Sequence, residues 1–345
     1  MDIYSPTVLQ EMVRIGLPDE FYFTQRYFNT VRTTTDEEIA FDELVDKYIL
    51  MPFVMPNVNG KPLVGSGYST KRFKPAYMQA EDAIRPANLS ARAFGEQINS
   101  IPDKLQRMNN GRMNILEAHT LAVRRTIEWM CAQYLTFGKY TVSGPDYPTV
   151  LLDFGRDAGN TIVNSGAALW TAPTTATPMA DIQALNQQIF NKAKCSAIEV
   201  TMTPEDYALF IKTTEVKDNF KLFMPTGGPL PNISPEAAAK VQRKGSLGDF
   251  NIVVYNDFYE VGGSQVRYLN PGTVLVASPD ETGLGGRQLY AGIQNLKAIA
   301  LGMDNRPIFQ NEWMTENGKA HMLSTESAPL IAARKVNAAG ALIVR

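Results

Sequence analysis

Residues 50–86 constrain the fold of this chain most, because they form a long extended stretch that proline and glycine interrupt. Asn59-Gly60 is a strong signal for a tight hairpin turn, since both central residues of such a turn need positive φ. Prolines at 52, 56 and 62 confine the flanking strands to sheet edges. A ribbon of two or three strands is marginal alone, and its exposed apolar side chains need a partner surface. The neighbouring sequence offers little cover, so we expect a second copy of the chain to supply it.

The composition predicts an ordinary globular protein that is long enough for two intertwined domains or one large one. Of the 345 residues, 44% are hydrophobic and 20% are charged, and 33 basic against 35 acidic residues leave a net charge of −2. No basic run exceeds a few residues, so no concentrated positive face for nucleic acid is expected. No window approaches about 20 apolar residues, which argues against a transmembrane helix. The N-terminus lacks the basic and apolar segments of a signal peptide.

Helical patterns lie on both sides of the extended stretch. Residues 6–17 have apolar side chains at helical spacing, and Pro18 opens a second, aromatic-rich helix. From about residue 103 to 137, apolar residues follow one face of a helix that would span roughly 50 Å. Gly138 stands where a left-handed C-cap is expected. The second helix is dense in aromatic residues, among them Phe21, Tyr22, Tyr27 and Phe28.

Strand patterns dominate the second half of the chain, so the predicted fold class is α+β. Residues 250–255 and 273–277 are apolar runs typical of buried strands. Gly262-Gly263 and Asn317-Gly318 each predict a hairpin. One compact module of strands and helices is expected over about 180–300. A second region would combine the long helix with a sheet built from distant segments, including the C-terminal hairpin.

The sequence carries no pattern that points to catalysis. The two histidines, His119 and His321, are far apart and belong to no HExxH motif, and no GxSxG or CxxC motif is present. Cys131 and Cys195 fit buried free thiols in a reducing compartment. Residues 282–287 are rich in glycine but lack the lysine of a phosphate-binding loop. We therefore predict no catalytic residues, no metal site and no cofactor.

An ordered series of short motifs runs along the chain. It begins on the extended stretch with Gly67, Ser69, Thr70, Phe73, Pro75, Tyr77 and Pro86. It continues after the long helix with Gly138, Lys139, Tyr140, Thr141, Asp153, Gly155, Arg156, Asn160, Ser165, Gly166 and Trp170. Later members are Ala208-Leu209-Phe210, Lys244-Gly245, Gly248-Asp249, residues 252–255 and residues 327–330. In this order, over nearly the whole chain from about residue 20, the series resembles the lambda-like phage major capsid proteins, the capsid protein E family.

The resemblance implies a Hong Kong 97-like capsid fold with a defined order of parts. Residues 1–45 would form the N-terminal arm, 46–90 the extended E-loop, and 91–178 a peripheral domain with a spine helix over about 103–137. Residues 179–303 would form the axial domain, and 304–345 would return to the peripheral sheet. E-loop contacts with a neighbouring subunit are expected at Asn59, Gly60, Gly67, Ser69, Thr70, Phe73, Pro75 and Tyr77. Contacts of the N-terminal arm are expected at Phe21, Tyr22, Tyr27 and Phe28.

The implied function is that of a major capsid protein, which forms the icosahedral head shell around the double-stranded DNA of a tailed bacteriophage. Its expected partners are its own copies in hexamers and pentamers, a separate scaffolding protein, a portal and a decoration protein at three-fold positions. Packaged DNA would touch the inner wall without specificity, and no membrane is involved. We expect synthesis and assembly in the cytoplasm of a host bacterium. The alternatives are another virion protein, such as a tail-tube protein, or a soluble enzyme with a substrate-binding arm.

Overall fold

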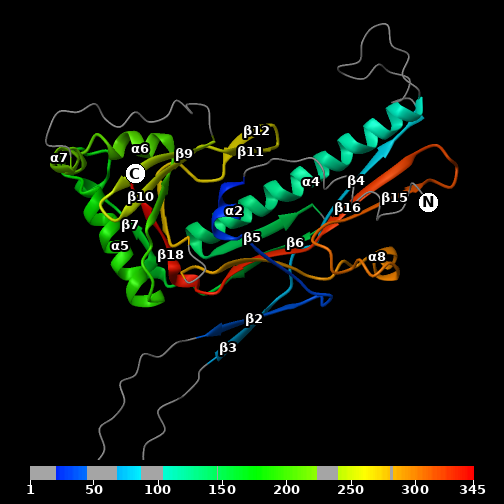
Figure 1. Cartoon of the computed structure of the whole chain (residues 1–345), viewed down its shortest axis with the longest axis horizontal. Helices are drawn as coiled ribbons and strands as arrows, with labels where there is room; N and C mark the ends of the chain where they lie inside the picture. Colours follow the sequence, from blue (N-terminus) through cyan, green and yellow to red (C-terminus); the bar gives the residue numbers. More distant parts are fainter. Residues whose placement is uncertain (1–20, 45–67, 87–103, 146, 224–239, 280–282) are drawn as a thin grey trace, which may run out of the picture.

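The computed structural model describes residues 21–44, 68–86, 104–145, 147–223, 240–279 and 283–345. The fold mixes helices and sheets, as predicted, and it is elongated along one long helix (Figure 1). A module with a six-stranded sheet lies at one end of the molecule, and narrower sheets run beside the long helix toward the other end. The α-helices are α2 (Tyr22–Tyr27), α4 (Lys104–Phe137), α5 (Pro178–Ala193), α6 (Pro204–Phe210), α7 (Thr214–Phe223) and α8 (Leu296–Ala300).

The predicted long helix is confirmed as α4, which has 34 residues. Its apolar face is buried from Leu116 to Tyr134 against the sheets, whereas Phe137 in the last turn is 37% exposed. Gly138 ends the helix in the left-handed conformation, with φ of 67°, and its N–H donates to the Tyr134 carbonyl at 2.8 Å. A residue with a Cβ is strained in this conformation, so glycine is the natural stop signal here.

The large sheet has the order β7-β18-β13-β8-β10-β9 and gathers strands from across the chain. Its strands are β7 (Thr161–Val163), β8 (Glu199–Met202), β9 (Val241–Leu247), β10 (Phe250–Tyr255), β13 (Thr273–Ala277) and β18 (Ala339–Ile343). The apolar runs at 250–255 and 273–277 are the buried strands β10 and β13, as predicted. Helices α4 and α5 both contact β18, so this strand lies in the core of the module.

Two strands pair across the expected boundary between the 179–303 and 304–345 segments. The C-terminal strand β18 pairs antiparallel with β13, inside the large sheet, instead of returning to the sheet beside the long helix. Conversely, β14 (Gly286–Tyr290) belongs to the 179–303 segment but pairs with β17 (Pro329–Ala333) and with β1 (Thr30–Thr33), outside the large sheet. The two segments thus exchange strands. Strand pairing joins residues that are remote in sequence, so apolar patterning alone does not reveal which sheet a strand enters.

The sheet beside α4 has the order β15-β16-β4, and its strands are β15 (Phe309–Met314), β16 (His321–Ser327) and β4 (Met78–Ile84). The Asn317-Gly318 hairpin between β15 and β16 is confirmed. The Gly262-Gly263 hairpin is also confirmed, between β11 (Phe258–Val261) and β12 (Ser264–Arg267). Another pair, β5 (Lys139–Gly144) and β6 (Tyr147–Asp153), follows α4 directly.

The strands β2 (Ile39–Leu44) and β3 (Tyr68–Phe73) form a two-stranded antiparallel ribbon. This ribbon projects from the body of the molecule (Figure 1). Strand β3 belongs to the extended stretch at residues 50–86 that the sequence singles out, and β2 precedes that stretch. The predicted Asn59-Gly60 turn and the predicted helix at residues 6–17 lie outside the described residues. Within the described ranges, no helix is both long and apolar enough to cross a membrane.

Candidate assembly surfaces

The first helix, α2, is anchored in the body of the same chain by two buried carboxylates. Glu128, in the middle of α4, accepts hydrogen bonds from the backbone N–H groups of Phe23 and Thr24, both at 2.9 Å. It also accepts from the Thr24 hydroxyl at 2.7 Å and from the Tyr255 hydroxyl at 3.0 Å. These donors favour the charged form, but burial is the larger effect and raises the pKa of Glu128.

The second carboxylate is Glu199, in strand β8 of the large sheet. Arg26 donates to it from Nη2 at 2.6 Å and from Nε at 3.0 Å. The hydroxyls of Tyr22 and Tyr27 also donate to Glu199, the latter at 3.2 Å. Burial, together with the nearby carboxylate of Glu199, raises the pKa of the Tyr22 hydroxyl, so the phenol remains a donor. The Arg26 guanidinium thus balances the charge of a carboxylate that is almost fully buried, and the two tyrosine hydroxyls help to orient it.

A third polar cluster ties α4 to the sheet β15-β16-β4. Arg112 of α4 donates to Glu312 of β15 at 2.7 Å, and the Glu312 side chain is fully buried. His321 of β16 lies 3.2 Å from the other oxygen of Glu312. Burial and the charge of Arg112 lower the pKa of His321. Two turns after Arg112 on α4, His119 lies within hydrogen-bond distance of Thr325 and of Asp82.

These clusters place both histidines of the chain at one contact, between α4 and the sheet beside it. They hold structural elements together and do not gather the groups that a metal ion needs. The described residues contain no group of three or more His, Cys, Asp or Glu side chains that could hold a metal ion. Cys131 is a buried free thiol, as expected, and burial raises its pKa, whereas Cys195 is only partly buried.

The four aromatic side chains for which a contact with a neighbouring subunit is expected lie in the body of their own chain. Phe21, Tyr22, Tyr27 and Phe28 are all buried within their own chain. Phe28 packs edge-on against Tyr134 with 5.6 Å between ring centroids, and Tyr22 lies 5.6 Å from Tyr255. The sequence shows how dense the aromatic residues are, but it does not show that the surface covering them belongs to α4 and β10 of the same chain.

The residues expected to make E-loop contacts fall into three groups. Asn59, Gly60 and Gly67 lie outside the described residues. Ser69 and Thr70 lie in β3 of the projecting ribbon, opposite Glu43 and Asp42 of β2. The third group begins with Phe73, the last residue of β3, and continues with Pro75 and Tyr77.

These last three side chains pack on their own chain. Phe73 is half-buried, with its ring centroid 4.8 Å from that of Phe154, and Pro75 is buried. The hydroxyl of Tyr77 donates to the buried carboxylate of Glu326. A neighbouring subunit is therefore not needed to bury most of their surface. Both rings keep some exposed surface, so their contacts with a neighbouring subunit stay a prediction.

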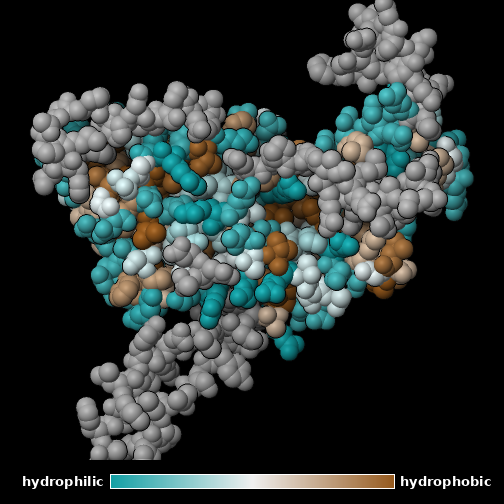
Figure 2. All heavy atoms as spheres, in the orientation of Figure 1, coloured by the Kyte–Doolittle hydropathy of each residue, from teal (hydrophilic) through white to brown (hydrophobic). Residues whose placement is uncertain are grey.

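Helix α8 presents an apolar surface that the sequence patterns did not single out. Leu296 is 86% exposed, Ile299 is 56% exposed and Leu301 is 46% exposed. Lys297 of the same helix donates to Asn311 of β15 at 2.6 Å, so α8 lies beside β15. The last two residues of that strand, Trp313 and Met314, are also exposed. Figure 2 shows hydrophobic residues gathered at the position of α8 on the edge of the molecule.

This cluster of exposed apolar side chains on α8 and β15 is called the α8 patch below. Leu296 and Ile299 lie three residues apart, so they share one helix face, which is the only signal that the sequence could have offered. An exposed apolar patch is costly in water unless another surface covers it. The α8 patch and the projecting ribbon are therefore the candidate assembly surfaces.

Comparison with solved structures identifies the fold. A prophage protein of Escherichia coli CFT073, described as a capsid protein, is similar over 100% of both chains, with a TM-score of 0.75 and 20% sequence identity. A phage-related protein of Bordetella bronchiseptica RB50 has a TM-score of 0.55 at 12% identity and covers 98% of this chain and 96% of its own. The α+β, Hong Kong 97-like fold class predicted from the sequence is confirmed.

Sequence relatives and a family profile lead to the same class. The chain is 25% identical to the major capsid protein of Enterobacteria phage phi80 over 334 residues, which is 96% of each chain. It is 25% identical to the major capsid protein of Escherichia phage lambda over 312 residues, 90% of this chain and 89% of that one. The profile of the phage major capsid protein E family matches residues 11–344, so the chain belongs to this family. It is a major capsid protein of the virion and not a tail-tube protein.

Proposed function

We propose that copies of this capsid protein assemble as hexamers and pentamers into an icosahedral shell that encloses double-stranded DNA. The observation that supports self-assembly most directly is the β2–β3 ribbon. Among the described residues, each of its strands pairs only with the other, and the ribbon projects from the body (Figure 1). Because an isolated two-stranded ribbon is marginally stable in water, it gains stability when a neighbouring subunit covers it.

In this proposal, residues 46–90 form an E-loop that lies on the next subunit, and Asn59, Gly60, Gly67, Ser69 and Thr70 supply its contacts. Residues 1–20 complete the N-terminal arm. The α8 patch adds an apolar contact between subunits. Each contact is modest by itself, and many such contacts around a closed shell give high avidity. The near-zero net charge suits an inner wall that touches packaged DNA without gripping it.

The remaining partners follow from the same proposal. A separate scaffolding protein and a portal would guide assembly in the cytoplasm of the host bacterium. A decoration protein at three-fold positions would add strands to exposed edges of the shell.

Deleting residues 59–67 tests the ribbon assignment. The variant should remain a folded subunit, with the same far-ultraviolet circular dichroism as the wild type, but form no closed shells in electron micrographs. A matched control replaces the same residues with a Gly/Ser segment of equal length, which keeps the reach of the ribbon and removes its side chains. Normal shells from the deletion variant would refute the role of the ribbon.

A further inference from the structure

The two halves of α4 are attached to the subunit in different ways. The second half, from Val123 to Leu135, lies in the main hydrophobic core. The first half packs on the sheet β15-β16-β4, where the apolar cluster has three buried members in the described part of the chain, Ile84, Leu116 and Leu323. Apolar burial is the main stabilising term in packing, so the first half costs less to separate from its partner than the second.

The register of the sheet shows which side chains meet the first half of α4. Glu312, Leu323 and Asp82 are direct partners across the three strands, so their side chains point to the same face. His321 lies two residues before Leu323 on β16 and shares this face, and its partner in β4 is Ile84. Two of these positions thus place a titratable side chain in a buried contact where packed sheets normally carry apolar residues.

Glu312 is the centre of this contact and faces two groups that can carry positive charge. Arg112 of α4 donates to one carboxylate oxygen at 2.7 Å, and Nε2 of His321 lies 3.2 Å from the other. The three side chains are 7% exposed or less. A neutral His321 can donate to Glu312 and so connects β16 to β15 and α4. A protonated His321 would instead be a second buried cation beside one carboxylate, and burial and the charge of Arg112 lower its pKa.

The other charged groups around His321 lie in solvent. Asp82 of β4 is 63% exposed and lies 2.9 Å from Nε2 of His119 on α4. Three more charged residues near the ends of these strands are exposed: Arg85, Glu316 and Lys319. Water and salt screen such charges, so Glu312 and Arg112 dominate the electrostatic environment of His321.

The second histidine has a different charge balance. A proton on His119 would form an ion pair with Asp82, whereas a proton on His321 meets a carboxylate that Arg112 already balances. We propose that His321 is an acid-sensitive latch, whose neutral form holds the first half of α4 to the sheet and whose protonation in mild acid releases that half. The latch belongs to the subunit by itself and does not depend on assembly.

The direction of the pH effect follows from proton linkage. When the contact is open, His321 is in water and takes up a proton near its ordinary pKa of about 6.5. When the contact is closed, its pKa is lower, so the closed form binds fewer protons. The contact is therefore fully stable above about pH 6.5 and weakens as the pH falls below that value.

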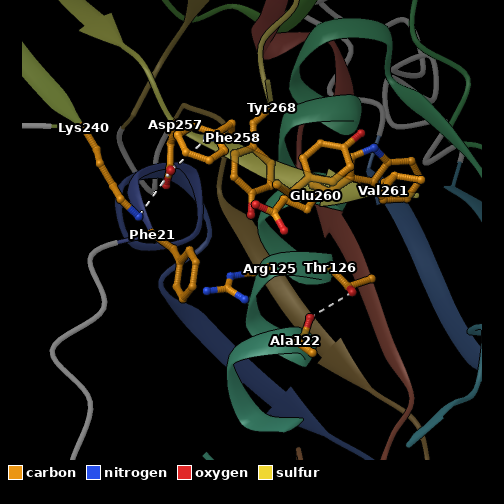
Figure 3. Close-up of a pocket in the computed structure, with 12 residues that line it drawn as sticks. Phe21, Ala122, Arg125, Thr126, Lys240, Asp257, Phe258, Glu260, Val261 and Tyr268 are labelled. Atoms are coloured by element: carbon orange, nitrogen blue, oxygen red, sulfur yellow. Dashed lines mark hydrogen bonds and ion pairs between the residues drawn. The ribbon is translucent and has the colours of Figure 1, made fainter. Parts of the chain in front are cut away.

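The second half of α4 is an internal reference, because acid does not weaken its contacts. On one side, it faces a groove of about 640 Å³ beside the β11–β12 hairpin (Figure 3). Among the described residues, no histidine lines this groove, and its charged residues are two of each sign: Arg125, Lys240, Asp257 and Glu260. Elsewhere on this half, burial raises the pKa of Glu128, so mild acid strengthens the contacts of that side chain.

Amide hydrogen exchange of the full-length, unassembled chain at pH 7.5 and pH 5.5 tests the latch, with each rate divided by the intrinsic rate at that pH. A short helical segment without tertiary contacts is marginal in water, so its amides lose protection when the contact opens. Protection of residues 108–119 should fall about threefold or more at pH 5.5, and that of residues 123–135 should not fall. An equal loss in both halves, or no loss in the first half, would overturn the proposal.

Two matched variants identify the titrating group. His321→Gln keeps a neutral donor for Glu312 but takes up no proton, so residues 108–119 should keep their protection at pH 7.5 and lose its dependence on pH. His119→Gln should retain the pH dependence of the wild type. A pH effect that persists in His321→Gln, or that disappears in His119→Gln, would contradict the assignment to His321.

A measurement on the wild type makes the test independent of whether the variants fold. The chain has two histidines, so histidine-selective carbon-13 labelling gives two ring signals in a nuclear magnetic resonance titration. One of the two should titrate with a midpoint below the ordinary value of about 6.5. Two midpoints at or above that value would show that the contact does not oppose protonation, and the latch would be refuted.

Discussion

The backbone N–H of Phe23, in the first turn of α2, donates a 2.9 Å hydrogen bond to the carboxylate of Glu128 in the middle of α4. The next amide, that of Thr24, donates to the second carboxylate oxygen at the same distance. The N-cap residue of α2 is Phe21, which has no side-chain acceptor of its own. Glu128 therefore satisfies amides that a helix of this kind leaves unpaired, and one helix caps another.

Replacing Glu128 by alanine should destabilise the subunit by about 3 kcal/mol, because two backbone amides and two hydroxyls lose a buried acceptor. Urea unfolding of the unassembled subunit measures the free energy. The region of α2 should also exchange its amide hydrogens faster, since Glu128 is its tertiary cap. Loss of stability below about 1 kcal/mol would show that water or another group replaces the carboxylate.

Replacing Glu128 by glutamine removes the ionisable group but keeps a side chain of the same size. The variant therefore isolates the effect of the charge of Glu128 on the free energy of unfolding. Burial raises the pKa of Glu128 above its ordinary value of about 4.5, so the folded chain holds this proton more tightly than the unfolded chain. Glu128 therefore makes the free energy of unfolding fall as pH rises from about 4.5 through the raised pKa. Glutamine has no such proton. The stability of the wild type relative to Glu128→Gln should decline from acidic toward neutral pH in urea titrations, and a difference that grows with pH would contradict this.

The ion pair of Arg112 and Glu312 gives a third prediction. Because both side chains are buried, Arg112→Met takes the arginine charge away from the Glu312 carboxylate and should cost about 3 to 5 kcal/mol in urea unfolding. The double variant Arg112→Met with Glu312→Leu removes both charges, and it should recover most of the loss. If the double variant is as unstable as the single one, then packing rather than burial of charge explains the effect.

The end of α4 gives a fourth prediction, about Gly138. A second glycine, Gly302, serves as its control. Gly138 and Gly302 both have φ near 65°, so a Cβ strains the backbone equally at either position. A Cβ at Gly138 would also collide with the side chain of Arg156, whereas a Cβ at Gly302 would meet nothing within 4 Å. Gly302→Ala should therefore cost about 1 kcal/mol.

Gly138→Ala should cost about 2 to 3 kcal/mol, because it displaces a capping group as well. The guanidinium of Arg156 donates to the Leu135 carbonyl at 2.6 Å and to the Thr136 carbonyl, which are both in the last turn of α4. Thermal unfolding of the two variants side by side gives the difference. Equal losses would mean that Arg156 moves aside without weakening the helix end.

The sequence predicted those elements whose signals are local. Gly138 ends α4, and Gly262-Gly263 and Asn317-Gly318 close hairpins, because these turns need positive φ and only a few residue types supply it. The apolar runs of β10 and β13 were equally clear, because a strand that is buried on both faces consists almost entirely of apolar residues.

The exchange of β14 and β18 between sheets was not predictable in this way. Any apolar strand could enter either sheet, and only the whole set of pairings decides. Glu128 and Arg112 were missed for a related reason. A charged residue on a helix normally faces solvent, and nothing near it in sequence indicates that Tyr255 or Glu312 lies beside it.

The α8 patch gives the last prediction, which concerns assembly rather than stability. Leu296→Asp and Ile299→Asp change side chains that are mostly exposed, so the free energy of unfolding of the subunit should change by less than about 0.5 kcal/mol. If a neighbouring subunit covers the patch, a carboxylate there must be desolvated on assembly without a partner, and shells should form slowly or not at all. Leu296→Met and Ile299→Met keep the surface apolar and should assemble normally. Light scattering and electron microscopy compare the four variants, and shells of normal yield from both aspartate variants would mean that the α8 patch stays in contact with solvent in the finished capsid.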